Sequence, residues 1–183
     1  GASISKPTDQ TKNGYAFGGW YTDNGTFENE YTFTTMPAEN ITIKANWKVN
    51  QYTITFDTVG GNTINPITQD YGTAVTAPAN PTKTGYTFDG WSVSVPTSMP
   101  AGNITIVAQW QVNQYTITFN SNGGSSVPAI TQDYGTKVTT PAEPTREGYT
   151  FIGWTPTVPA TMPAEDVTLV AQWEAVIYTV VFN

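Results

Sequence analysis

The chain has 183 residues and contains neither Cys nor His, which excludes disulfides, thiol chemistry, Cys or His metal sites and histidine-based catalysis. Its net charge of −7, with only seven Lys and Arg residues, speaks against a nucleic acid partner. No apolar run reaches the roughly 20 residues that a membrane-spanning helix needs, so no membrane insertion is expected for this sequence.

The chain nearly repeats itself at an interval of 63 residues. Tyr52–Gln114 and Tyr115–Ile177 align without a gap, and 36 of the 63 positions are identical. Parts of the same unit precede and follow these copies. We therefore expect a partial first repeat with a hairpin insert at 1–51, a second repeat at 52–114, a third repeat at 115–177 and the opening strand of a further repeat at 178–183. Arrays usually act through length and multiplicity, so the function is expected to lie in the repetition.

One predicted strand, present in all three repeats, begins at a Gly-Tyr pair and ends at a Trp. Its copies are Gly14–Trp20, Gly85–Trp91 and Gly148–Trp154. Each Trp lies three residues after a core-facing Phe, not two, so a bulge is needed to return the indole to the core side. The Gly directly before each Trp, at 19, 90 and 153, is the expected place for it.

An insert and a closing strand follow. Thr22–Phe33 is present only in the first repeat, and its Asn24-Gly25 pair predicts an extra hairpin. In the closing strand, Ile41–Trp47, apolar residues alternate with polar ones, and the pattern returns at 104–110 and 167–173. This alternation predicts half-buried antiparallel strands with one apolar face.

The two full repeats open on a strand of the pattern Tyr-Thr-Ile-Thr-Phe, at Tyr52–Phe56 and Tyr115–Phe119. A Gly-Gly turn, a short strand at Ile67–Gln69 and a turn at Asp70-Tyr71-Gly72 come next in the second repeat. The prolines that follow are too dense for a helix to form there.

The connections between repeats are expected to be short. Only Gln111–Gln114 separates Trp110 from the next opening strand, so neighbouring repeats in the chain are expected to lie end to end with limited bending. The segment 178–183 carries an opening strand with no unit behind it. Through Tyr178, Val180 and Phe182 it is expected to add to the sheet edge of the first repeat of another molecule.

Together these elements resemble the Listeria–Bacteroides repeat, the family that includes the internalin B-repeat. The family pattern reads Tyr-Thr-(aliphatic)-Thr-Phe, Asn-Gly-Gly, Tyr-Gly, Pro-x-x-Pro-Thr, Gly-Tyr-x-Phe-x-Gly-Trp and (aliphatic)-Thr-(aliphatic)-x-Ala-x-Trp. In the third repeat these are Tyr115–Phe119, Asn122–Gly124, Tyr134-Gly135, Pro141–Thr145, Gly148–Trp154 and Val167–Trp173. The second repeat matches except that Val59 replaces the Asn.

The resemblance implies a mainly β fold of tandem small β-grasp-like domains with little or no helix. It also implies an extracellular place, in bacterial cell-surface or secreted proteins. The family offers no catalytic, cofactor-binding or metal-binding residues to carry over, so none is expected here and no cofactor is expected. The second and third repeats depart from the family by shortening the loop after Gly-Trp, which puts any binding role of that loop in doubt for both.

Aromatic side chains are candidates for stacking on sugar rings. The Trp residues of the two full repeats lie in phase with core positions, which favours burial over sugar binding; they are Trp91, Trp110, Trp154 and Trp173. Tyr21 and Phe27 of the insert are better candidates for exposure.

Acidic and amide side chains offer weaker signals. Asp70 and Asp133 each precede Tyr-Gly, where Asp commonly stabilises a turn, and this role is favoured over a catalytic carboxylate pair. The remaining acid clusters lack the spacing of a calcium loop, which favours solvated charge; they are Asp23, Glu28, Glu30, Glu165 and Asp166. Glycosylation sequons occur at Asn24, Asn40 and Asn103 but fit a Thr-rich strand composition. Lys44 has no counterpart in the other repeats, so no lysine crosslink is expected.

The sequence thus predicts a non-catalytic tandem repeat module that acts as a semi-rigid spacer or stalk. The alternative is an adhesion module that binds a host protein or glycan directly.

Overall fold

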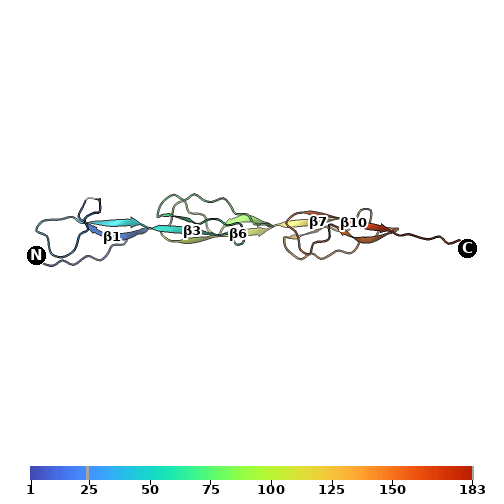
Figure 1. Ribbon diagram of the computed structural model, residues 1–183, viewed down its shortest axis with the longest axis horizontal. Helices are drawn as coiled ribbons and strands as arrows, with labels where there is room; N and C mark the ends of the chain where they lie inside the picture. The colour runs from blue at the N-terminus through green and yellow to red at the C-terminus, as the bar shows by residue number, and fades with distance from the viewer. Residues whose placement is uncertain (24, 183) are drawn as a thin grey trace. The chain divides into compact units, whose positions relative to one another are not determined.

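The computed structural model describes residues 1–23 and 25–182, and within these residues every regular element is a β-strand (Figure 1). The strands are β1 Tyr15–Tyr21, β2 Lys44–Val49, β3 Gln51–Asp57, β4 Ile67–Asp70, β5 Tyr86–Trp91, β6 Ile104–Val112, β7 Gln114–Asn120, β8 Ile130–Asp133, β9 Tyr149–Thr155 and β10 Val167–Ala175. The described residues contain no helix of the length and apolarity that crossing a membrane requires.

The strands form two four-stranded sheets of the same topology and one two-stranded sheet. The full sheets have the orders β4-β3-β6-β5 and β8-β7-β10-β9, and the reduced sheet consists of β1 and β2. The expected all-β fold of tandem sheets is therefore confirmed. The β-grasp assignment stays a prediction.

The opening and closing strands lie side by side at the centre of each full sheet and run parallel (Figure 1). The expectation of a wholly antiparallel arrangement is wrong at this pair. Parallel neighbours need a crossover of a dozen or more residues, and the segment between β3 and β6 is long enough to supply it. The other described pairings, β1 with β2, β3 with β4, β7 with β8 and β9 with β10, are antiparallel.

The chain forms two compact units, one of residues 1–59, 63–79 and 91–108 and one of residues 60–62, 80–90 and 109 onward. The division passes through the second repeat, so the repeat boundaries remain predictions from the sequence. The core of the first unit consists of Ile54, Phe56, Met99 and Ile106. Ile54 and Phe56 face inwards from β3 because residues two apart in a strand share a face.

The core of the second unit repeats this pattern. Its buried members are Ile117, Phe119, Val138, Trp154, Met162, Leu169 and Ala171. Ile117 and Leu169 are fully inaccessible to solvent, as are their counterparts Ile54 and Ile106 in the first unit. The same alternation therefore builds the same core twice, in a chain that has no Cys.

A bulge occurs at the expected glycine. In the first repeat the register moves three residues along β1, from Phe17 to Trp20, while β2 advances by two, from Trp47 to Ala45. The third repeat has its register shift opposite Gln172 and Trp173 of β10. Gly19, Gly90 and Gly153 all have positive φ. The bulge prediction is thus confirmed in β1 and β9.

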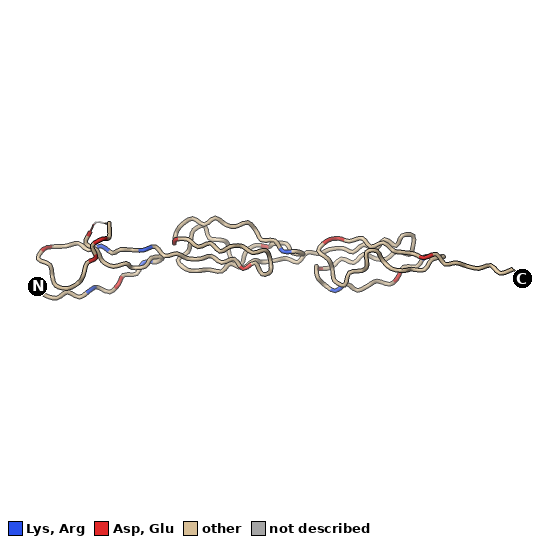
Figure 2. The backbone as a smooth tube through the Cα atoms, viewed as in Figure 1, with Lys and Arg blue, Asp and Glu red and all other residues tan. Residues whose placement is uncertain are grey.

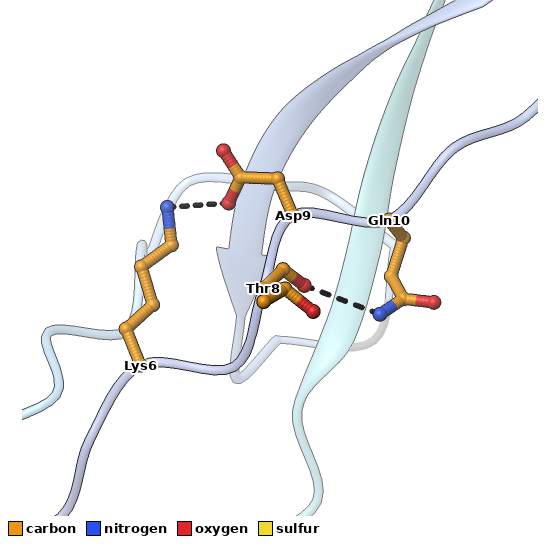
Figure 3. Close-up of polar contacts among 4 residues, drawn as sticks. All are labelled: Lys6, Thr8, Asp9 and Gln10. Carbon is orange, nitrogen blue, oxygen red and sulfur yellow. Dashed lines mark hydrogen bonds and ion pairs between the residues drawn. The ribbon is translucent and has the colours of Figure 1, made fainter.

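Charged groups contribute little to cohesion. Acidic and basic residues are scattered along the chain (Figure 2). Lys6 and Asp9 form an ion pair of 2.6 Å near a hydrogen bond of 3.2 Å from Gln10 to the Thr8 carbonyl (Figure 3). Both partners of the ion pair are exposed, and such pairs contribute only about 0–1 kcal/mol. The folded state therefore depends on the apolar cores.

The first repeat has no closed core. Among the described residues from 1 to 53, no apolar side chain reaches full burial. The buried indole N–H of Trp20 finds no hydrogen-bond partner among the described residues. The reduced sheet explains this openness, because within the described part of the chain no opening strand pairs with β2.

Truncation of aligned isoleucines tests whether the core of the first repeat is more open than that of the second. Ile106→Ala should lower the free energy of unfolding by about 2–5 kcal/mol, because Ile106 is fully buried and its truncation leaves a cavity. Ile43→Ala, at the aligned position of the half-buried residue in the first repeat, should cost clearly less in dilute solution. Urea unfolding followed by tryptophan fluorescence measures both. Equal losses would show that the first repeat has a closed core after all.

Candidate functional site: the joints between repeats

A tyrosine-on-glycine contact occurs twice in the structure. Tyr71 follows β4 in the Asp-Tyr-Gly turn, and its ring meets the Tyr15 ring edge to face, with centroids 5.9 Å apart at 80°. Tyr134 meets Tyr86 in the same way, at 5.9 Å and 82°. We name the group Gly14, Tyr15, Asn50 and Tyr71 joint 1, and the group Gly85, Tyr86, Asn113 and Tyr134 joint 2. Joint 1 lies within the first compact unit and joint 2 within the second.

The glycine of each joint is required for two reasons. Gly14 has a φ of 78° and Gly85 one of 77°, a left-handed conformation that side chains rarely adopt. A Cβ on Gly14 would also overlap the Tyr71 ring, and a Cβ on Gly85 the Tyr134 ring. Both glycines are buried. The tyrosine ring therefore occupies the space that a side chain would need.

Backbone hydrogen bonds hold the tyrosine turn to the glycine turn through one linker residue. In joint 1 the Asn50 N–H donates to the Gly14 carbonyl at 2.9 Å, and the Tyr71 N–H donates to the Asn50 carbonyl at 2.8 Å. In joint 2 the Asn113 N–H donates to Gly85 at 3.0 Å, and the Tyr134 N–H donates to Asn113 at 2.9 Å.

The linkers are shorter than the sequence suggested. β2 ends at Val49 and β3 begins at Gln51, so one residue lies between them. β6 ends at Val112 and β7 begins at Gln114, which again leaves a single residue. The expected four-residue linker is mostly strand, and its free backbone is tied down by the bonds of the joint.

In each joint a lysine ammonium lies over the tyrosine that directly follows the joint glycine. The Lys12 ammonium lies 4.0 Å from the Tyr15 ring centroid, and the Lys83 ammonium lies 4.2 Å from that of Tyr86. Contacts of this kind contribute about 0.5–1 kcal/mol at exposed sites. The cation also covers apolar ring surface with its methylene stem.

The third repeat provides an internal comparison. Gly148 has a φ of 75°, its carbonyl accepts the Val176 N–H at 2.9 Å, and Arg146 lies 3.9 Å from the Tyr149 ring. No described atom lies within 4 Å of a Cβ built on Gly148, and Tyr149 is 39% exposed. The Gly-Tyr turn with its cation therefore forms without a second tyrosine, and the ring of that tyrosine is what buries the turn in joints 1 and 2.

Comparison with known proteins places the chain in a family. A sequence profile described as the Listeria-Bacteroides repeat domain matches residues 1–46, 52–109 and 115–172. The chain belongs to this family. A Listeria monocytogenes protein named Internalin H is 43% identical over 121 residues, which cover 60% of this chain and 22% of that protein.

Other relatives cover more of the chain. An Evansella cellulosilytica protein described as a Gly-rich membrane protein is 33% identical over all of this chain and 23% of its own length. The chain thus spans less than a third of the relatives it matches. Among solved structures, domains 3–4 of a streptococcal cell surface protein with high identity repeats in tandem align with 70% of this chain and 99% of theirs, at 19% identity and a TM-score of 0.25.

Of the four tryptophans in the two full Listeria–Bacteroides repeats, Trp154 lies in a core and Trp91 and Trp173 pack against one, as expected. Trp154 is buried, with its ring 5.0 Å from that of Phe119. The other three are half-buried and lie 5.3 to 5.6 Å from Phe rings; they are Trp91, Trp110 and Trp173. The Trp173 indole N–H also donates to the Ser121 carbonyl at 2.9 Å.

The insert of the first repeat corrects one expectation. Tyr21 and Phe27 are half-buried and pack edge to face with centroids 5.5 Å apart, so they do not form an exposed aromatic surface. An antiparallel bridge from Tyr21 to Glu30 closes the loop. The expected hairpin turn at Asn24-Gly25, and the Asn24 sequon, fall on a residue outside the described ones.

One acidic residue of the insert, Asp23, binds backbone N–H groups of the same loop. The Asp23 carboxylate accepts the N–H groups of Phe27, Glu28 and Asn29, each at 2.7 Å. These bonds, that of Asn29 first, lower the pKa of Asp23 below its ordinary value. Among residues 1–23 and 25–182, no cluster of three acids could hold a metal ion, and the other two acids, Glu28 and Glu30, are exposed.

The remaining candidates also have structural partners. Asp70 and Asp133 each accept a hydrogen bond of 2.9 Å from the Gln that opens the neighbouring strand, Gln51 or Gln114. Their carbonyls, not their carboxylates, close the turn with Thr73 and Thr136.

The residue directly before each full closing strand accepts a hydrogen bond from the neighbouring opening strand. Asn103 accepts the Thr53 N–H at 2.9 Å, and Asp166 accepts the Thr116 N–H at 2.8 Å. Asn40, Lys44 and Glu165 have exposed side chains.

The sequence pattern did not predict the joints, although their residues recur in successive repeats. Each joint tyrosine belongs to the Asp-Tyr-Gly turn of one repeat, and each joint glycine to the Gly-Tyr pair of the repeat before it. The repeat pattern shows that both residues are needed in every unit, but it does not pair residues across units.

Alanine substitution of matched glycines tests the joint. Gly85→Ala introduces left-handed strain of roughly 1–2 kcal/mol and also displaces the Tyr134 ring, at a further cost of about 1–3 kcal/mol. Gly148→Ala introduces similar strain in open space and serves as the control. Denaturant unfolding should therefore show the larger loss for Gly85→Ala, and NMR should show the Tyr86 to Tyr134 ring contacts gone. Equal losses with those contacts retained would contradict the close approach.

Proposed function

We propose that this chain is a non-catalytic tandem repeat module of a bacterial cell-surface or secreted protein and that it works as a semi-rigid spacer. The observation that carries the proposal is the joint, whose glycine, tyrosines and linker residue make the same contacts in joint 1 and joint 2. A single linker residue held by two hydrogen bonds does not behave as a loose tether. A recurring joint lets the length of a stalk grow by the addition of repeats.

Support for an extracellular, cell-surface place comes from the relatives. One is named Internalin H, and another is described as a membrane protein. Because the chain spans less than a third of either, the proposal concerns this module and its neighbouring repeats.

A second candidate function is adhesion to a host protein or glycan. It is favoured by an apolar groove of about 390 Å³ on the first repeat, since hollows of this kind bind partners. Residues at corresponding positions of the two full repeats are buried, as Met99 and Met162 show at 1% exposure each. The groove is therefore not a feature of the repeat as such, which favours the spacer.

Spin-label distances test the spacer directly. The chain has no Cys, so Thr55→Cys and Thr118→Cys place two labels on exposed strand positions of the second and third repeats. The spacer account expects a narrow distance distribution that broadens at least twofold in Tyr134→Ala, because joint 2 loses its ring contact. Pulsed electron spin resonance measures the width.

Tyr149→Ala is the matched control, because no described atom lies within 4 Å of a Cβ built on the adjacent Gly148, where the other joints have a second tyrosine. Its distribution should equal that of the parent chain. A broad distribution in the parent, or no broadening in Tyr134→Ala, contradicts a semi-rigid joint. Saturable binding of the full chain in a glycan and host-protein screen, abolished by Met36→Asp in the groove, would support adhesion instead.

A further inference from the structure

The opening and closing strands hold the two ends of each full repeat. In the second repeat β3 begins at Gln51, directly after the linker residue Asn50. At the other end of that repeat β6 ends at Val112, directly before the linker residue Asn113. In the third repeat the chain enters through β7 and leaves through β10 in the same way. Tension along the chain therefore enters a repeat at the start of its opening strand and leaves at the end of its closing strand.

The parallel direction of these two strands decides how they are loaded. In the second repeat the register runs from Ile54 beside Ile104 to Asp57 beside Val107, and the third repeat has the same register at the aligned positions. Tension pulls the opening strand backwards at its start and the closing strand forwards at its end. The two strands are thus forced to slide past one another, and the evenly spaced hydrogen bonds of a parallel ladder are loaded together. A ladder pulled apart from one end breaks one pair at a time.

Packing on the inner side of the sheet opposes this sliding. Ile54 and Ile106 are fully inaccessible to solvent, Phe56 is 6% exposed, and their counterparts in the third repeat have the same burial. Side chains in a close-packed core interdigitate, so the strands cannot slide unless these side chains leave their positions. The core also keeps water from replacing a ladder bond from the inner side.

One further bond joins the two strands where the tension enters. The Asn103 Oδ1 accepts the Thr53 N–H at 2.9 Å, and the Asp166 carboxylate accepts the Thr116 N–H at 2.8 Å. Each acceptor stands directly before its closing strand, and each donor belongs to the first half of its opening strand. An amide and a carboxylate thus extend the ladder by the same bond in the two repeats.

We propose that each full repeat resists tension along the chain through its central parallel strand pair, which must slide before the repeat can unfold. This inference rests on the proposed spacer function, because a stalk between two attached parts is what carries such a load. The edge strands β4 and β5 lie outside the direct path between the two ends of the second repeat. Forced unfolding is governed by the unfolding rate, so a small repeat of modest stability can still bear a load.

Single-molecule force spectroscopy of the full chain tests the proposal through the direction of pulling. Handles on Gln51→Cys and Gln111→Cys load the second repeat as a stalk would, which we call the sliding geometry. Handles on Asp57→Cys and Gln109→Cys pull the same ladder apart from one end, which we call the peeling geometry. All four residues are exposed, and the chain has no Cys of its own. At equal loading rate the unfolding force should be at least twofold higher in the sliding geometry.

Removal of the further bond separates loss of mechanical resistance from general destabilisation. Asn103→Ala removes the acceptor of the Thr53 N–H, so it should lower the unfolding force in the sliding geometry by at least a fifth. The same substitution should leave the force in the peeling geometry unchanged, because this bond lies at the far end of the ladder and breaks last. Asn65→Ala, at an exposed asparagine outside the strands, is the matched control and should change neither force.

Two results would overturn the proposal. One is an equal unfolding force in the two geometries, and the other is an Asn103→Ala variant that leaves the force in the sliding geometry unchanged or lowers both forces alike. The released length, roughly 3.3–3.6 Å per residue, shows that the second repeat is the one that has opened. Either result would leave the spacer proposal intact, because the spin-label distances report on bending at joint 2 without load.

Discussion

Parallel pairing between the opening and the closing strand is the interaction on which each repeat depends. In both full sheets these two strands are central, and they carry all of the core side chains that are fully inaccessible to solvent: Ile54, Ile106, Ile117, Leu169 and Ala171. A repeat of about 60 residues is near the lower size limit for independent folding without disulfides or metals. The unit succeeds because two alternating strands place an Ile and a Phe of the opening strand opposite aliphatic residues of the closing strand, with a Trp from the bulged strand beside them. Beside β2, where no opening strand pairs among the described residues, the aligned side chains are half-buried or exposed.

The second constraint is the use of glycine at the joints. Gly14 and Gly85 are needed for their backbone conformation and because a tyrosine ring rests on them. The contact joins the Gly-Tyr turn of one repeat to the Asp-Tyr-Gly turn of the next through one hydrogen-bonded linker residue. The spacer proposal follows from the fact that every part of the joint belongs to the repeat itself. A repeat that carries both halves of a joint can be copied without new interface residues.

Much of this fold could be predicted from the sequence. Period-2 alternation located the strands, the three-residue step from Phe17 to Trp20 located the bulge, and phase predicted inward-facing tryptophans. The parallel central pair could not be predicted, because alternation fixes which face is buried but not which strand lies alongside. The joints were missed for a similar reason, since Tyr71 and Gly14 are 57 positions apart and belong to different motifs. The half-burial of Tyr21 and Phe27 was missed because three backbone N–H groups fold the loop onto Asp23.

Amide hydrogen exchange in dilute solution tests the central claim most directly, because it reports whether a closing strand is protected when no opening strand lies beside it. The account predicts strong protection at Ile106 and Leu169, close to that of global unfolding. It predicts weak protection at Ile43, at least a hundredfold below that of Ile106. Comparable protection at all three would mean that the closing strand makes its core unaided, and the account would be wrong.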